Sequence, residues 1–192
     1  MLSLQGDFAR HLAMLRELGA DAAPVRRPGD LSGRDGLVLP GGESTTMLKL
    51  MEGSGMEEAI RGFHRDGGGL FGTCAGLILL GVRVTGPAQR SLGLLDVDVA
   101  RNGYGRQTDS FETDLAWTED EGGVRGVFIR APRITRLGEG VRCLAVHEGE
   151  PVLVRQDRIL AATFHPELTR DPRVHRCFLE MTVRGTRHEM AH

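Results

Sequence analysis

The sequence predicts an α/β fold with a mixed, mostly parallel central sheet and helices on both faces. As far as about Arg83, short apolar runs alternate with stretches of helical periodicity, a rhythm that places parallel strands between helices. Three turns after predicted strands carry glycines or reactive side chains: residues 40–46, 73–76 and 164–167. Such folds gather their functional residues at the carboxyl ends of strands, so we expect these turns to converge there.

Size and composition limit the classes of protein that the chain can represent. At 192 residues and 20.9 kDa it suits one domain, 1–192, with a frayed polar tail at 185–192. The net charge of −2 and the scattered arginines argue against nucleic-acid binding. No apolar run approaches the roughly 18 residues that span a membrane, and no signal-peptide pattern opens the chain. We expect a soluble, cytoplasmic protein.

The cysteines are few and far apart. Cys74, Cys143 and Cys177 include no CxxC pair, which argues against a zinc site and against a disulfide framework. An odd number of separated cysteines is typical of a reducing compartment. We expect neither a metal nor a cofactor, we assign no role to Cys143, and we place Cys177 on the buried face of the last helix.

The first predicted elements are short. Met1–Gly6 has the pattern of the end of a strand, and Asp7 can cap a helix that Gly19 ends. The apolar stripe of that helix consists of Phe8, Leu12, Leu15 and Leu18. Ala22–Arg26 is predicted as a second short strand. Gly36–Leu39 has the apolar pattern of a buried parallel strand.

A glycine-rich turn, Pro40–Thr46, follows this strand and precedes a helix predicted from about Met47 to Met51. Its paired glycines allow a close approach of the backbone to a ligand, and its free N–H groups suit a carboxylate or an oxyanion. The spacing is not that of a phosphate-binding loop. Taken alone, the turn is better interpreted as a plain strand-to-helix connection.

Cys74 stands at the most distinctive turn. A buried strand, Leu70-Phe71, leads through Gly72 to Cys74, and small residues and an apolar helix follow. This is the pattern of a nucleophile elbow, whose backbone is strained and whose neighbours must be small. A helix N-terminus also favours the reactive thiolate. The alternative interpretation is a buried cysteine that acts as a small apolar residue.

The second half of the chain is richer in strands. Leu95, Val97 and Val99 alternate with aspartates, as in a strand with one exposed face. Further strands are predicted near 110–117, 124–130, 141–147, 151–155 and 158–164, after a loop at 101–106. Helices are predicted at 56–65 and from Pro172 to about Arg184.

His165 and Glu167 supply the partners that a thiol nucleophile needs. An imidazole accepts the proton of the thiol, and a carboxylate orients the imidazole. Residues two apart on an extended chain point to the same side, so Cys74, His165 and Glu167 can form a triad. The remaining histidines have no such context, and we interpret them as surface or internally satisfied residues: His11, His64, His147, His175, His188 and His192.

These motifs resemble the class I (triad) glutamine amidotransferases, which implies their flavodoxin-like fold. The resemblance rests on residues 39–47, 71–76 and 163–167. More narrowly, the chain resembles the glutaminase subunits of pyridoxal 5′-phosphate synthase. The stretches that favour this subfamily are Leu4–Asp7, Arg101–Gln107 with Asp109–Glu112, and Gly126–Pro132.

The resemblance implies an activity and a set of site residues. Cys74 would attack the side-chain amide of L-glutamine and form a thioester, releasing ammonia and then glutamate, with His165 moving protons and Glu167 orienting His165. The backbone N–H groups of Gly42 and Ala75 would form the oxyanion hole. The implied substrate-binding residues are Gly41, Gly42, Glu43, Arg101, Ile129 and Arg130.

The resemblance also implies a partner. Ammonia would pass to a separate (β/α)8-barrel synthase subunit, which builds pyridoxal 5′-phosphate, in a complex of twelve copies of each subunit. Gln5 matches a position at that interface. Family members begin with several more apolar residues, whereas Met1 here falls inside the first strand. Either the start codon is placed too late or the strand is clipped, and we expect a clipped strand to lower stability and weaken docking.

Three alternatives remain open at this point. The first is a triad amidotransferase subunit of histidine or nucleotide biosynthesis, against which the elbow and the loop from Arg101 to Gln107 argue. The second is a peptidase-like cysteine hydrolase on a similar fold, which the His165-x-Glu167 pair fits badly. The third is a binding module that has lost its activity, against which the intact set of three reactive side chains argues.

Overall fold

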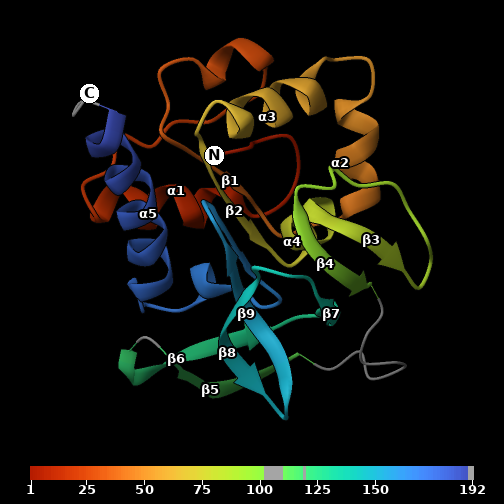
Figure 1. Cartoon of the computed structure of the whole chain (residues 1–192), viewed down its shortest axis with the longest axis vertical. Helices are drawn as coiled ribbons and strands as arrows, with labels where there is room; N and C mark the ends of the chain where they lie inside the picture. Colours follow the sequence, from red (N-terminus) through yellow and green to blue (C-terminus); the bar gives the residue numbers. More distant parts are fainter. Residues whose placement is uncertain (102–109, 119, 190–192) are drawn as a thin grey trace.

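The structure is a computed structural model that describes residues 1–101, 110–118 and 120–189 (Figure 1). Its helices are α1 (Phe8–Glu17), α2 (Ser44–Met51), α3 (Met56–Arg65), α4 (Ala75–Leu80) and α5 (Arg173–Glu189), with 3₁₀ turns η1 (Pro28–Leu31) and η2 (Pro166–Leu168). Its strands are β1 (Gly36–Leu39), β2 (Gly69–Thr73), β3 (Gly81–Thr85), β4 (Leu95–Ala100), β5 (Phe111–Trp117), β6 (Asp120–Phe128), β7 (Arg133–Leu137), β8 (Arg142–His147), β9 (Glu150–Gln156) and β10 (Ile159–Ala162).

The strands of the described residues form a large mixed sheet and a small one. The large sheet has seven strands in the order β1-β2-β10-β9-β8-β5-β6, and the small one has the order β3-β4-β7. β1, β2 and β10 pair in parallel, whereas β9, β8, β5 and β6 continue the sheet by antiparallel pairing. The parallel strands therefore lie where the predicted functional turns begin.

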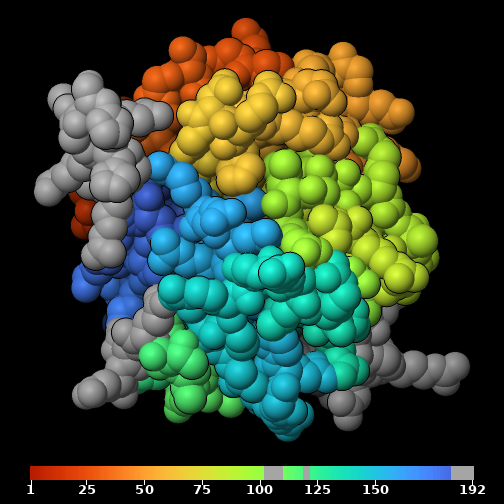
Figure 2. All heavy atoms as spheres, viewed as in Figure 1, coloured from red at the N-terminus to blue at the C-terminus, as the bar shows by residue number. Residues whose placement is uncertain are grey.

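Helices cover both faces of the parallel strands, as the sequence predicts (Figure 1). On β2, Phe71 packs into a core with the apolar faces of α1 and α5, and its neighbour Leu70 packs into a core with α2, α3 and α4. This alternation is the expected consequence of a strand buried on both sides. The space-filling view shows the helical half and the antiparallel strands packed against each other, which favours the single domain that the sequence predicts (Figure 2).

Two strands of the structure, β3 and β7, are not predicted by the sequence pattern. β3 begins at Gly81, directly after α4 ends at Leu80, so no turn residues mark the boundary between them. β7 has five residues with one buried side chain, Ile134, and therefore shows no clear alternation. Together with β4 these strands make the small sheet, beside the apolar core that contains α4.

The ends of two helices also differ from the expected ones. α2 begins at Ser44 instead of Met47, because the carboxylate of Glu43 accepts a hydrogen bond from the N–H of Thr45 and caps the helix. α5 continues beyond the expected end near Arg184, so the chain that was expected to fray from residue 185 is helical through Glu189. Residues 190–192 lie outside the described residues. None of the helices in the described part of the chain is long and apolar enough to cross a membrane.

The two short strands predicted near the N-terminus are reduced to a single bridge between Leu2 and Val25. The N–H of Leu2 also donates to the carbonyl of Val38, so the first residues lie between that segment and β1. The amino group of Met1 donates to the carbonyl of Ala23 at 3.0 Å. Burial, reinforced by the charge of Arg34, lowers the pKa of this amino group to about 6. A cavity of about 380 Å³ adjoins Met1.

The buried amino group gives a first testable prediction. The unfolded chain binds this proton more readily than the folded chain, so folding stability rises by about 2 kcal/mol as the pH increases from 6 to 8. Extending the chain ahead of Met1 with three valines replaces the charge by an amide and places apolar side chains toward the cavity. We expect a higher melting temperature and a flatter dependence on pH.

A Gly-Ser-Gly extension of the same length is the control, because it removes the charge without filling the cavity. Melting curves at pH 6 and pH 8 separate the two effects. Equal melting temperatures for the two extensions would show that the cavity contributes nothing. An unchanged pH dependence in both would show that the amino group is not the titrating group.

Candidate active site

Cys74 lies at a strained corner between β2 and α4. It precedes the first residue of α4 and has φ 48° and ψ −102°, in the region of positive φ that L-residues rarely adopt. Its N–H donates to the carbonyl of Ala162 at the end of β10, at 2.9 Å. The side chain is 7% exposed. This geometry is that of the predicted nucleophile elbow.

Two glycines allow the elbow to form. A Cβ on Gly76 would overlap the carbonyl oxygen of Leu39 and lie 2.8 Å from its carbonyl carbon. A Cβ on Gly72 would lie 2.7 Å from the carbonyl carbon of Gly76. The strand before Cys74, the helix after it and β1 therefore approach one another more closely than any side chain permits.

His165 and Glu167 are brought to Cys74 by the turn after β10. The Nδ1 atom of His165 lies 2.8 Å from Oε1 of Glu167, and the Cys74 side chain is near enough to raise the pKa of His165. The backbone N–H of His165 donates to the carbonyl of Val127, which fixes the turn against β6. Both side chains of the pair are almost fully buried. The structure thus assembles the three side chains that the sequence singled out.

The electrostatics of this cluster favour charged partners. Burial alone would lower the pKa of His165, but its interactions with Cys74 and Glu167 outweigh burial and raise the pKa to about 10. Burial alone would raise the pKa of Glu167, but the nearby imidazole of His11, 3.2 Å from Oε2, and the hydrogen bond with His165 outweigh it and hold that pKa below its usual value. An imidazolium is therefore stabilised between a carboxylate and the sulfur.

The glycine-rich turn after β1 borders the triad. A Cβ on Gly41 would lie 2.9 Å from Nδ1 of His165, so the backbone of the turn rests against the imidazole ring. The side-chain oxygen of Gln5 accepts a hydrogen bond from the N–H of Glu43 at 2.8 Å. Gly42, which lies between Gly41 and Glu43 in the chain, has φ 146°. This contact with His165 distinguishes the turn from a plain connection.

The predicted substrate-binding side chains gather at the same turn. Arg101 donates to Oε1 of Glu43 at 3.1 Å. A hydrogen bond from Thr45 lowers the pKa of Glu43, and the charges of Arg101 and Arg130 lower it further, against the effect of burial. Arg130 has φ 43° and follows Ile129 just beyond the end of β6. The residues from Asn102 to Asp109, part of the motif that favours the narrower resemblance, lie outside the described residues.

Two histidines lie closer to the triad than the sequence indicates. His11 and His175 are 0% exposed and hydrogen-bond each other, as the prediction of internally satisfied residues allows, but His11 also contacts Glu167. A signal was present, because His11 shares the apolar stripe of its helix with Leu15 and is its one polar member. A histidine on such a stripe needs a buried partner.

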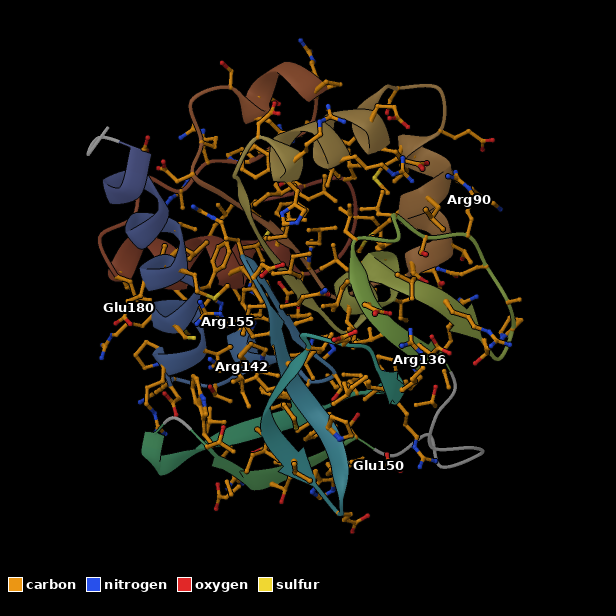
Figure 3. All side chains as sticks on the ribbon, in the orientation of Figure 1. Arg90, Arg136, Arg142, Glu150, Arg155 and Glu180 are labelled. Carbon is orange, nitrogen blue, oxygen red and sulfur yellow. The ribbon has the colours of Figure 1, made fainter. Side chains whose placement is uncertain are left out.

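The other two cysteines lie away from the triad. Burial raises the pKa of both Cys143 and Cys177. Cys177 is only partly buried on α5, and the charged side chains that act on it, Arg142, Arg155 and Glu180, are labelled in Figure 3. Within the described ranges, no three His, Cys, Asp or Glu side chains gather as they would around a metal ion.

A cysteine at an elbow beside a His–Glu pair, at the carboxyl edge of parallel strands, defines the class of the triad glutamine amidotransferases. Residues 1–184 match the SNO glutamine amidotransferase family, and the chain belongs to that family. The fold and the class that the sequence predicted are confirmed.

Individual relatives give the same result. The chain is 54% identical to the pyridoxal 5′-phosphate synthase subunit PdxT of Thermus thermophilus, over 94% of this chain and 95% of the relative. It is 50% identical to the subunit of that name from Thermotoga neapolitana, over 94% and 97%. A crystal structure of a glutamine amidotransferase superimposes with a TM-score of 0.89 at 51% identity, covering 94% of this chain and 96% of that one.

Proposed function

We propose that the chain is the glutaminase subunit of a pyridoxal 5′-phosphate synthase and hydrolyses L-glutamine to L-glutamate and ammonia. One observation carries the proposal: Cys74 sits at a strained elbow and raises the pKa of the neighbouring His165, whose Nδ1 atom lies 2.8 Å from Oε1 of Glu167. The names of relatives that share about half of its residues support the choice of pathway.

The reaction follows from this geometry. The sulfur of Cys74 attacks the side-chain carbonyl carbon of glutamine, and the proton held by His165 passes to the amide nitrogen. The carbon–nitrogen bond breaks, ammonia leaves, and a thioester remains. His165 then removes a proton from water, whose oxygen attacks the thioester carbon. The carbon–sulfur bond breaks, glutamate is released, and Glu167 keeps His165 oriented throughout.

Backbone donors stabilise the negative oxygen in both steps. Ala75 is the first residue of α4, where N–H groups lack acceptors within the helix. Gly42 belongs to the turn that borders His165. We assign the two N–H groups as the oxyanion hole, whose donors are worth about 3–4 kcal/mol each in comparable enzymes.

The turn also offers groups for the backbone end of glutamine. The substrate carries an α-carboxylate, which suits Arg101 or Arg130, and an α-ammonium, which suits Glu43. We include Gly41 and Ile129 in the site because they border these residues in the chain. Replacing Arg101 by glutamine is expected to raise the KM for glutamine by roughly 10- to 100-fold with little change in kcat.

Arg136→Gln is the matched control, since Arg136, labelled in Figure 3, pairs with Asp96 and Asp98 on the small sheet. Steady-state kinetics of glutamate release check both variants. An equal fall in kcat and kcat/KM for Arg101→Gln would contradict a role in ground-state binding.

In this proposal the ammonia passes to a second protein, because none of the residues assigned here would build pyridoxal 5′-phosphate from it. We propose a (β/α)8-barrel synthase subunit as that partner, in a complex of twelve copies of each, with Gln5 at the interface. Gln5 is well placed to couple partner binding to the active site, since its side-chain oxygen accepts a hydrogen bond from the N–H of Glu43. We also propose a cytoplasmic location, which the free cysteines support.

Glutamate release from glutamine, measured with and without the cognate synthase subunit, tests the proposal. We expect release to rise when the partner is added, and heat-denatured partner serves as the control. Full activity without the partner would indicate a free-standing glutaminase. No release under either condition would indicate a binding module and overturn the proposal.

A further inference from the structure

A chain of buried polar contacts continues beyond Glu167, away from Cys74. The Nε2 atom of His11 lies 3.2 Å from Oε2 of Glu167 and 3.2 Å from the hydroxyl oxygen of Thr73. The Nδ1 atom of His11 lies 2.8 Å from Nε2 of His175. His11 comes from α1 and His175 from α5, the two helices that cover the same face of the sheet (Figure 1).

The position of the protons in this chain follows from His175. Burial lowers the pKa of His175 to about 3, so its ring is neutral and carries one N–H. Its Nδ1 atom is buried and has no hydrogen-bond partner among the described residues. A buried N–H without an acceptor is the rarer and costlier arrangement, so the proton belongs on Nε2 and is donated to Nδ1 of His11.

The proton of His11 is fixed in turn. Its Nδ1 accepts from His175, so its own N–H is on Nε2, which hydrogen-bonds the hydroxyl of Thr73 and lies 3.2 Å from Oε2 of Glu167. Oε1 of Glu167 already accepts from His165, whereas Oε2 is buried and has no hydrogen-bond partner among the described residues, with Nε2 of His11 3.2 Å away. A buried carboxylate oxygen without a donor is strongly destabilised. His11 is thus the donor available to it.

We propose that His11 is a positioning residue for the triad: its Nε2–H holds Glu167 ionised and aimed at His165, and His175 fixes the tautomer of His11. This inference rests on the proposed glutaminase function. It extends the series of buried polar contacts from α5 to the triad.

Other charged groups lie near Glu167 but at greater exposure. They border a neighbouring cavity of about 600 Å³ and come from α1 and from the turn and helix after η2: Arg10, Glu17, Arg170 and Arg176. Arg10, Arg170 and Arg176 are exposed to solvent, which screens their charges. The two imidazoles therefore dominate the surroundings of the carboxylate.

The test compares two replacements of His11 that differ in reach. Glutamine places an amide N–H near the former Nε2 position, whereas asparagine reaches only as far as Nδ1. His64→Asn is the matched control, because His64 is a partly buried histidine that contacts the backbone at Gly68, outside this chain of contacts. Glutamate release by the complex with the synthase subunit gives kcat, KM and their pH profiles.

A second readout needs neither substrate nor partner. The rate at which iodoacetamide alkylates Cys74, followed by mass spectrometry of the Cys74 peptide across pH, reports the state of the cysteine–histidine pair in the isolated chain. If no variant and no wild-type sample releases glutamate, the proposed function fails. The alkylation profile then still decides the role of His11.

For His11→Asn we expect kcat to fall roughly 10- to 100-fold with KM nearly unchanged, and the acidic limb of both profiles to move up by about one pH unit. Without the donor, Glu167 takes up a proton at a higher pH. The protonated Glu167 no longer stabilises the charged His165, so activity is lost at a higher pH. His11→Gln should keep most of the activity and the wild-type limb, and His64→Asn should match the wild type.

The acidic limb is located by the pH at which the rate is half its maximum. This pH does not depend on the amount of folded protein, so it can be compared even if His11→Asn lowers the folded fraction. An unshifted limb in His11→Asn would overturn the proposal. Equal losses in the asparagine and glutamine variants, without any shift, would assign His11 a packing role only.

Discussion

Replacing Cys74 by alanine is expected to lower glutamate release at least about 10⁴-fold. The variant loses the atom that forms the thioester, and the remaining donors of the site give only the modest residual catalysis that disabled triads retain. Alanine has the same Cβ as cysteine, so the positive φ at this corner costs no more than before. The melting temperature should therefore stay close to that of the wild type.

Cys143→Ala is the matched control, since Cys143 is partly buried on β8 and its thiol donates to the carbonyl of Ala145. Glutamate release with the synthase subunit present, together with a melting curve, checks both variants. If the Cys74 variant kept more than about a hundredth of the activity, another group would have to attack the amide, and the thioester mechanism would be wrong.

Replacing Gly76 by alanine is expected to destabilise the fold by about 3 kcal/mol or more and to impair activity as well. The new methyl group would overlap the carbonyl oxygen of Leu39, which is backbone and fully buried. Relief requires α4 to move away from β1. Such a movement displaces Cys74 and the N–H of Ala75 together.

Gly62→Ala provides the control for this variant. Gly62 lies inside α3, and the nearest atom to its added Cβ is the flexible end of Arg65 at 3.6 Å. Alanine there should stabilise the protein by roughly 0.5–1 kcal/mol, because it restricts the unfolded chain and favours helix. Urea unfolding midpoints measure both changes. A stable, active Gly76→Ala protein would show that the approach of α4 to β1 is not required.

The sequence predicted the centre of the molecule well, because local chemistry determines it. The elbow at Cys74 needs small residues next to the nucleophile, and these are visible in the chain. His165 and Glu167 are two residues apart, so their joint orientation follows from strand geometry. Gly41 was ambiguous, and only its contact with the ring of His165 distinguishes a site from a connection.

The features that the sequence did not reveal depend on packing between distant elements. His11 and His175 are 164 positions apart, and nothing local indicates that α1 and α5 bring their rings together. The bridge between Leu2 and Val25 likewise depends on tertiary contacts, because neither segment is long enough to show a strand pattern. Such contacts override local propensity.

The buried amino terminus also has a practical consequence for chemical labelling. Lys49 is the single lysine of the sequence, and it is exposed on α2. The amino group of Met1 is buried and donates a hydrogen bond to the carbonyl of Ala23. An amine-reactive fluorophore should therefore attach at one defined position near the glycine-rich turn. That gives a ready optical probe of subunit association without any engineered cysteine.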